Sequence, residues 1–186
     1  MGEIKSALEI ALEKAERLGS LSKKELENQK WQDEGKKKAA AFLKGEMDSL
    51  QKGLSDIPTE FLQTGLSGAI EILLRNIILP REKGQWETIN RAFEGIKEIR
   101  GSIAQQIIPQ IEYLLKNYEQ TLENYKQQFQ QQLKASLGSK AQGGMMAMTP
   151  EEMNALASMQ DEWNKISAEI TSQFEKQLEP LKTYLK

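Results

Sequence analysis

The chain of 186 residues contains no histidine, no cysteine and no valine. Without histidine it lacks the side chain that most often acts as general acid or base near neutral pH, and it cannot form the usual di-metal carboxylate bundle, which needs Glu-x-x-His pairs. Without cysteine it has no disulfides, no thiolate nucleophile and no Cys-ligated metal. Valine is among the strongest strand formers, so its absence beside abundant Leu, Glu, Lys, Gln and Ala predicts an all-α chain.

An excess of charge of one sign is also missing. The sequence has 25 basic and 27 acidic residues, a formal net charge of -2. Proteins that bind phosphate backbones usually show a strong basic excess. A glycine-rich phosphate loop is absent as well, because the stretch GSKAQGG (138–144) has neither the required glycine spacing nor a preceding strand.

Neither a signal peptide nor a membrane span is expected. The amino-terminal stretch EIKSALEIALEKAE (3–16) is charged throughout, whereas a signal peptide needs an apolar core. The most apolar stretch, 61–79, carries Glu71 and Arg75 near its middle, where charges make insertion into a bilayer costly. We therefore expect a cytoplasmic protein without a membrane span.

That apolar stretch, FLQTGLSGAIEILLRNIIL, is the centre of the predicted fold. Its large apolar residues fall on most of the circumference of a helix, which is typical of a helix in the middle of a bundle. Pro58 precedes it and Pro80 follows it, and neither residue continues a helix. We predict a buried helix over 59–79.

Two helices are predicted before this central helix. Apolar residues at three- and four-residue spacing indicate a helix over 3–18 that ends at Gly19, and Ser22 with Glu25 has the form of a capping box that would start a second helix, 22–57. The section QKWQDEGKKKAA (29–40) is polar on all sides except for Trp31. We expect this section to be exposed or frayed.

Two long helices are predicted after the central helix. The first runs from Trp86 to Leu137, with a kink or break near 101–109 because Gly101 and Pro109 interrupt it. The second begins after Thr149 with Pro150 at its first position and carries a heptad pattern, and Pro180 is expected to bend or end it. The apolar residues of that pattern are Leu156, Met159, Trp163, Ile166, Ile170, Phe174, Leu178, Leu181 and Leu185.

The fold class predicted from these patterns is all-α: an elongated bundle of about five helices with a long antiparallel carboxy-terminal helical hairpin, and with coiled-coil character. We predict a helical body, 1–108, around the buried helix, and an antiparallel helical hairpin, 109–186, with a Gly/Met-rich tip at 138–148. The two parts are expected to form one continuous structural unit. The hairpin either packs along the body or projects from it.

The amino-terminal residues EIKSALEIALEKAERLGSLS (3–22) resemble the opening of an uncharacterised bacterial protein family that is all-helical and of unknown function. The resemblance implies a bacterial, cytoplasmic origin. It implies no activity, cofactor or site residue.

Pairs of carboxylates are the only pattern that suggests acid–base chemistry or a hard cation. Glu94 and Glu98 share a helical face, and so do Glu119 and Glu123. Helices routinely place glutamate on a solvated face, and we favour that interpretation. We predict no catalytic residue, no metal site and no cofactor, and thus a protein that is not an enzyme.

One basic cluster could contact an anionic surface. Lys36, Lys37 and Lys38 lie close to Trp31 in the sequence, a combination that suits nucleic acid or an anionic membrane. Acidic residues flank the cluster, and consecutive lysines point in different directions around a helix, so a solvated face is the favoured interpretation.

The predicted tip carries Met145, Met146 and Met148. Methionine is flexible and polarisable, which suits an adaptable contact with a protein partner, although packing against the adjacent helix ends is the more common role. This chain is rich in amphipathic helical patterns and poor in chemical motifs. We therefore favour a non-enzymatic protein–protein interaction or scaffold protein that binds a protein partner or its own copy. The alternatives are nucleic-acid or anionic-surface binding through Lys36–Lys38, and small-molecule binding within the bundle.

Overall fold

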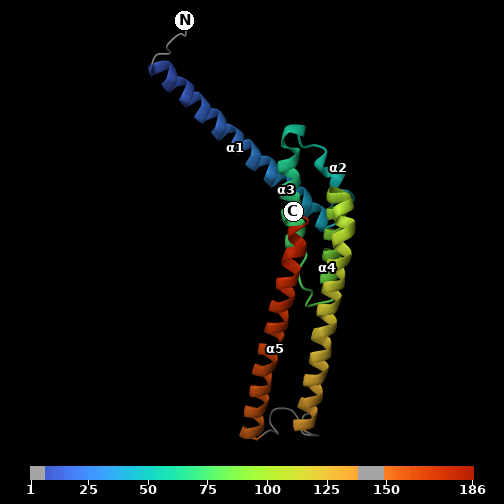
Figure 1. Cartoon of the computed structure of the whole chain (residues 1–186). Coiled ribbons are helices and arrows are strands. Elements are labelled where there is room, and N and C mark those ends of the chain that lie inside the picture. Colours follow the sequence, from blue (N-terminus) through green and yellow to red (C-terminus); the bar gives the residue numbers. More distant parts are fainter. Residues whose placement is uncertain (1–6, 138–148) are drawn as a thin grey trace. The chain divides into compact units, whose positions relative to one another are not determined.

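A computed structural model describes the backbone of residues 7–137 and 149–186 and most of the side chains from residue 22 onward. Figure 1 shows its elements: α1 (Ala7–Leu43), α2 (Leu50–Leu54), the 3₁₀ helix η1 (Thr59–Phe61), α3 (Leu62–Arg75), α4 (Gln85–Leu137) and α5 (Pro150–Thr183). These residues include no strand, so the predicted all-α class is confirmed. Across the same residues, no helix is long and apolar enough to cross a membrane.

The chain forms two compact units. The first unit contains the chain up to Ile77 together with Asn90–Gly101, and the second unit contains Ile78–Ile89 and Ser102–Leu185. The carboxy-terminal Lys186 belongs to the first unit. The predicted division at residue 108 stays a prediction.

In the first unit, α1 is one helix where the sequence predicted two. It runs through Gly19 and Ser22 without interruption and ends at Leu43 rather than continuing to Ile57. Gly45, with φ of 79°, ends it: the Gly45 N–H donates to the Phe42 carbonyl and the Glu46 N–H to the Ala41 carbonyl. This pair of hydrogen bonds is a Schellman motif, which needs a left-handed residue at this position. The glycine that ends the helix is Gly45, not Gly19.

The section 29–40 packs against α3, so the expectation of an exposed or frayed section was wrong. Three glycines bring the two helices together: a Cβ atom on Gly35 would overlap the Gly65 carbonyl oxygen, and one on Gly68 would overlap the Gln32 carbonyl oxygen. Ala39 and Phe42 lie on the same side of α1 and are 0% and 2% exposed. The contact depends on small residues, which a search for large apolar side chains does not detect.

Side chains from α4 fix the end of α1 and the start of α2. The Arg91 guanidinium donates to the Phe42 carbonyl (2.9 Å) and to the Met47 carbonyl (3.3 Å). The Glu98 carboxylate accepts from the Ser49 hydroxyl (3.0 Å) and from the Gln51 backbone N–H (2.8 Å). Glu98 thus satisfies a backbone N–H in the first turn of α2, which that helix leaves unpaired, and Arg91 joins the end of α1 to the segment before α2.

The central helix is shorter than predicted, because α3 ends at Arg75. Its buried residues are Gly65, Gly68, Ala69, Ile70, Leu73 and Leu74. Phe61 before it and Ile77 after it are also buried, whereas Leu62, Leu66 and Ile72 are half-buried.

The predicted interruption of α4 lies at Gly101. This residue has φ of 50° and ψ of -115°, and it joins two helical segments, whereas Pro109 lies within the second segment. The Trp86 indole N–H donates to the Glu119 carboxylate at 2.8 Å, although 33 residues separate them. A straight helix would hold them about 50 Å apart. The chain therefore reverses direction within α4.

In the second unit, the carboxy-terminal part of α4 and α5 run side by side as an antiparallel hairpin (Figure 1). Tyr118 meets Phe174 edge to face at a centroid distance of 5.4 Å, and Phe129 meets Trp163 at 5.6 Å. Every apolar residue of the predicted heptad pattern is buried or half-buried. α5 begins at Pro150 as predicted and continues through Pro180 to Thr183.

Burial decreases along the hairpin. Tyr118 is the last fully buried residue of α4, and Ile170 is the first of α5. Among the residues whose side chains are described, none in 119–135 or 149–169 is fully buried. The distal hairpin is therefore a two-helix structure with a half-exposed apolar seam.

Candidate functional site

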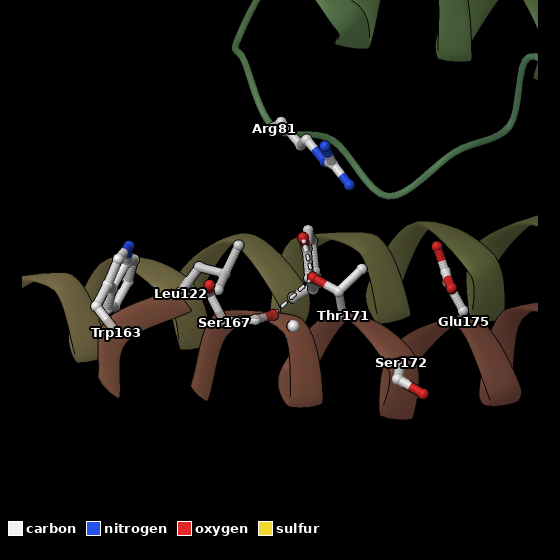
Figure 2. Close-up of a pocket in the computed structure, with 9 residues that line it drawn as sticks. Arg81, Leu122, Trp163, Ser167, Thr171, Ser172 and Glu175 are labelled. Carbon is white, nitrogen blue, oxygen red and sulfur yellow. Dashed lines mark hydrogen bonds between the residues drawn. The ribbon is translucent and has the colours of Figure 1, made fainter. Parts of the chain in front are cut away.

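A groove of about 550 Å³ runs along the hairpin beneath the loop that joins α3 to α4 (Figure 2). An adjoining hollow of about 820 Å³ shares Arg81, Leu122 and Trp163 with it. We call the two together the Arg81–Trp163 groove. The other residues that line the first hollow are Tyr118, Ser167, Ala168, Thr171, Ser172 and Glu175. The second hollow is also lined by Pro80, Lys83, Glu119, Gln120, Glu123 and Lys126.

At the floor of the groove, one hydrogen bond within α5 and one between α4 and α5 hold the side chain of Thr171. Thr171 donates its hydroxyl proton to the Ser167 carbonyl at 2.8 Å. Since that hydroxyl has one proton, the Tyr118 hydroxyl is the donor in its 3.1 Å contact with Thr171 Oγ1. Tyr118 itself is 1% exposed. The floor therefore has a fixed geometry and no unsatisfied hydroxyl at this point.

Trp163 and Leu122 give the groove an apolar centre. Both are half-buried, and Trp163 packs on Phe129 from the neighbouring helix. A tryptophan held on one side by another ring loses little conformational freedom when a ligand covers its free side. This pair can accept an apolar side chain from a partner.

Arg81 provides the charge at the groove. The loop is fixed at this point because the backbone N–H groups of Arg81 and Glu82 both donate to Gln85 Oε1, at 2.6 Å and 3.3 Å. Figure 2 shows the guanidinium extending from the loop towards the two helices. Within the part of the chain that the structure describes, this guanidinium has no hydrogen-bond or ion-pair partner. It can bind a carboxylate without first breaking an internal ion pair.

The remaining charges around the groove are of both signs. Lys83 and Lys126 are cationic, whereas Glu123 and Glu175 are anionic. Glu119 is engaged by the Trp86 indole, and Glu123 accepts from the Gln127 amide at 3.1 Å. The mixed signs suit a polypeptide surface better than a polyanion.

The lysines of the predicted basic cluster are all in ion pairs. Lys36 lies 3.2 Å from Glu71, Lys37 lies 3.7 Å from Glu34, and Lys38 lies 3.2 Å from Asp56. Lys36 is also 3.9 Å from Asp33.

Trp31, the aromatic member of the cluster, packs within the first unit. It stacks on Phe61 at a centroid distance of 6.1 Å, with Lys30 4.9 Å from its ring. The structure therefore places Trp31 and the three lysines on α1, with their side chains engaged inside the chain.

Three of the four glutamates that sequence analysis singled out have structural partners, because Glu123 accepts from the Gln127 amide and two others bind more distant groups. Glu98 caps α2, and Glu119 accepts the Trp86 N–H. No group of three or more acidic side chains that could hold a metal ion occurs in the described residues. Met145, Met146 and Met148 lie outside those residues.

Sequence analysis did not identify the Arg81–Trp163 groove. Trp163 was assigned to the heptad pattern, and Arg81 was not singled out. A local pattern does not reveal that this loop lies over the hairpin, because the arrangement depends on contacts between distant residues. The one signal in the sequence was an arginine directly after the proline that follows the apolar stretch.

Comparison with known proteins identifies a family but no characterised relative. The model of a family of unknown function (DUF6657) matches residues 51–186. No curated protein and no solved structure matches the chain. The match begins near α2 and covers both helices of the hairpin and the loop that carries Arg81.

Proposed function

Since the chain belongs to this family of unknown function, we propose a role from its geometry: a non-enzymatic protein that binds a helical segment of a protein partner in the Arg81–Trp163 groove. The predicted membership of an uncharacterised family is confirmed by the family match. The bacterial origin and the cytoplasmic location stay predictions.

The observation that carries the proposal is the Arg81 guanidinium, which pairs with no side chain among the described residues and lies beside the half-buried Trp163 and Leu122. Tryptophan, tyrosine and arginine are the residues that most often dominate the binding energy of protein interfaces, particularly where they surround a pocket. Here Trp163 and Arg81 line one groove, and a hydrogen bond from the buried Tyr118 to Thr171 joins the two helices at its floor. Little ordering would be needed on binding.

The chemistry of the groove indicates the kind of segment that fits. Amphipathic helices bind hydrophobic grooves through apolar residues at three- and four-residue spacing. Trp163 and Leu122 would accept such residues, and Arg81 would pair with an acidic side chain of the same helix. The half-exposed seam of the distal hairpin continues the apolar surface through Phe129 and Met159.

Binding of nucleic acid through Lys36, Lys37 and Lys38 stays a prediction that the geometry does not favour. Each lysine already pairs with a carboxylate, so a phosphate would compete with an existing ion pair. Small-molecule binding within the bundle likewise stays a prediction.

The proposal is tested by affinity capture from lysate of the source organism, with nuclease present, using the full chain and three variants. Trp163→Ala removes the apolar anchor and Arg81→Glu reverses the charge. Lys97→Glu, at an exposed lysine of α4 that lines no part of the groove, makes a charge change of the same size. We expect a stoichiometric protein partner to bind the wild-type chain and Lys97→Glu, and to be lost or reduced at least about tenfold in the other two.

Equal capture by the three variants would contradict the proposal. Capture that disappears with nuclease would also contradict it and would favour the lysine cluster instead. The folding of each variant is checked by circular dichroism, because a chain that unfolds would lose every partner.

A further inference from the structure

A second groove in the hairpin differs from the first in its charge. It has a volume of about 710 Å³ and lies between α4 and α5 of the second unit. Its apolar lining residues are Pro109, Tyr113, Leu114, Phe174 and Leu181, and its remaining lining residues carry amide groups. None of its lining residues is charged, in a chain of which 28% is charged.

The rim of this uncharged groove exposes aromatic surface. Tyr113 lines the groove and is 69% exposed. Pro109 is also exposed, and Phe174 and Leu181 are half-buried. Apolar surface that solvent reaches in this way often marks a contact surface.

We infer that a second copy of this chain binds at the uncharged groove, with the two copies related by a two-fold axis. In such a contact the same patch is present on both sides, so a charged side chain near the axis meets its own copy and is repelled. A patch without charge avoids this repulsion. The Arg81–Trp163 groove does not avoid it, because Arg81, Lys83 and Lys126 all line it.

The polar groups of the uncharged groove also suit a self-complementary contact. Gln110, Asn117 and Gln177 each carry both a donor and an acceptor in one amide. An amide can therefore pair with the identical amide of another copy, which a carboxylate or an ammonium group cannot do. The Gln110 amide N–H already donates to the Gln106 carbonyl at 3.1 Å, which leaves its oxygen as an acceptor.

This inference depends on residues other than those of the proposed function. A scaffold protein would then have one surface for its own copy and another for its partner. Failure of one proposal leaves the other intact, because no residue lines both the uncharged groove and the Arg81–Trp163 groove.

The test is the mass of the full chain in solution, measured by sedimentation equilibrium over a wide range of concentrations. We expect the wild-type chain to form a dimer. Tyr113→Lys would place two ammonium groups close together and raise the dissociation constant by roughly tenfold or more. Tyr125→Lys is the matched control, since Tyr125 is an exposed tyrosine of the same helix that does not line the groove. It should leave the dissociation constant unchanged.

Two further measurements identify the cause of a weakened dimer. In 1 M salt the Tyr113→Lys chain should regain part of its affinity, because the repulsion is screened. Mixing Tyr113→Lys with Tyr113→Glu chains should restore a dimer through opposite charges. A wild-type chain that stays monomeric at every concentration would overturn the inference, as would a dimer equally sensitive, or equally insensitive, to the two lysine substitutions.

Discussion

Gly35, Gly65 and Gly68 determine how closely α1 and α3 can approach in the first unit. The backbones touch at these positions, because a Cβ atom on Gly35 or Gly68 would overlap a carbonyl oxygen of the opposite chain segment. Glycine usually weakens a helix by about 1 kcal/mol relative to alanine. Here the close approach of the two helices offsets that cost.

The first prediction concerns Gly35→Ala. The added methyl group has no space, because the opposing atoms belong to the Gly65 backbone and cannot rotate away. We expect the free energy of unfolding to fall by about 3 kcal/mol, since overpacking outweighs the gain in helix propensity. Denaturant unfolding followed by circular dichroism measures the change.

Gly84→Ala is the control, because no atom lies within 4 Å of the position that its Cβ would take. It should change the free energy of unfolding by less than about 0.5 kcal/mol. A Gly35→Ala chain as stable as the wild type would show that the two helices do not cross as closely as described.

Glycines also account for the two errors that sequence analysis made about α1. Sequence analysis ended a helix at Gly19 and continued the next one through Gly45, whereas Gly45, with φ of 79°, follows the end of α1. The section 29–40 was expected to be exposed because its contact residues are glycine and alanine. A pattern of large apolar residues does not detect a helix that packs through small ones.

At the scale of elements, the two long helices after the central helix were predictable, and the break within the first of them was predictable only approximately. The predicted limits of 86–137 agree closely with α4, and the start at Pro150 agrees with α5. Their regular apolar spacing covers many turns, and Thr149–Pro150 is a strong start signal. The break within α4 was placed only within 101–109, because glycine and proline both allow one. Gly101 adopts the positive φ and Pro109 remains helical.

The second prediction concerns the two ends of the hairpin. The proximal part has fully buried residues such as Ile111, Leu115 and Leu178, whereas no described side chain in 119–135 or 149–169 is fully buried. Backbone amides open more easily where few apolar contacts hold them. Hydrogen exchange by mass spectrometry should find slow exchange over 104–118 and 170–178 and faster exchange over 120–135 and 150–166.

Addition of a partner that binds the Arg81–Trp163 groove should slow exchange over 120–135 and 150–166. Equally slow exchange along the whole free hairpin would contradict this account, because the two helices of its distal part have too few buried contacts to protect their amides.

At the scale of the whole molecule, fold class and family were predictable from sequence, and the candidate site was not. Composition alone indicated an all-α chain, because helix formers are abundant and valine is absent. In the Arg81–Trp163 groove, Arg81 meets residues of two helices that lie 37 to 94 positions further along the chain, from Tyr118 to Glu175, and no local pattern encodes such a meeting. The lysine cluster was visible in the sequence, whereas its ion pairs with Glu71 and Asp56 were not.

The central claim is that a protein partner occupies the Arg81–Trp163 groove, and site-specific photo-crosslinking in cells tests it most directly. A photoreactive amino acid replaces Ala168, which is exposed and lines the groove, or Gln173, which is exposed on the same helix and does not. The account predicts a crosslinked protein from position 168 and little or none from position 173. No crosslinked protein from position 168, or equal yields from the two positions, would contradict it.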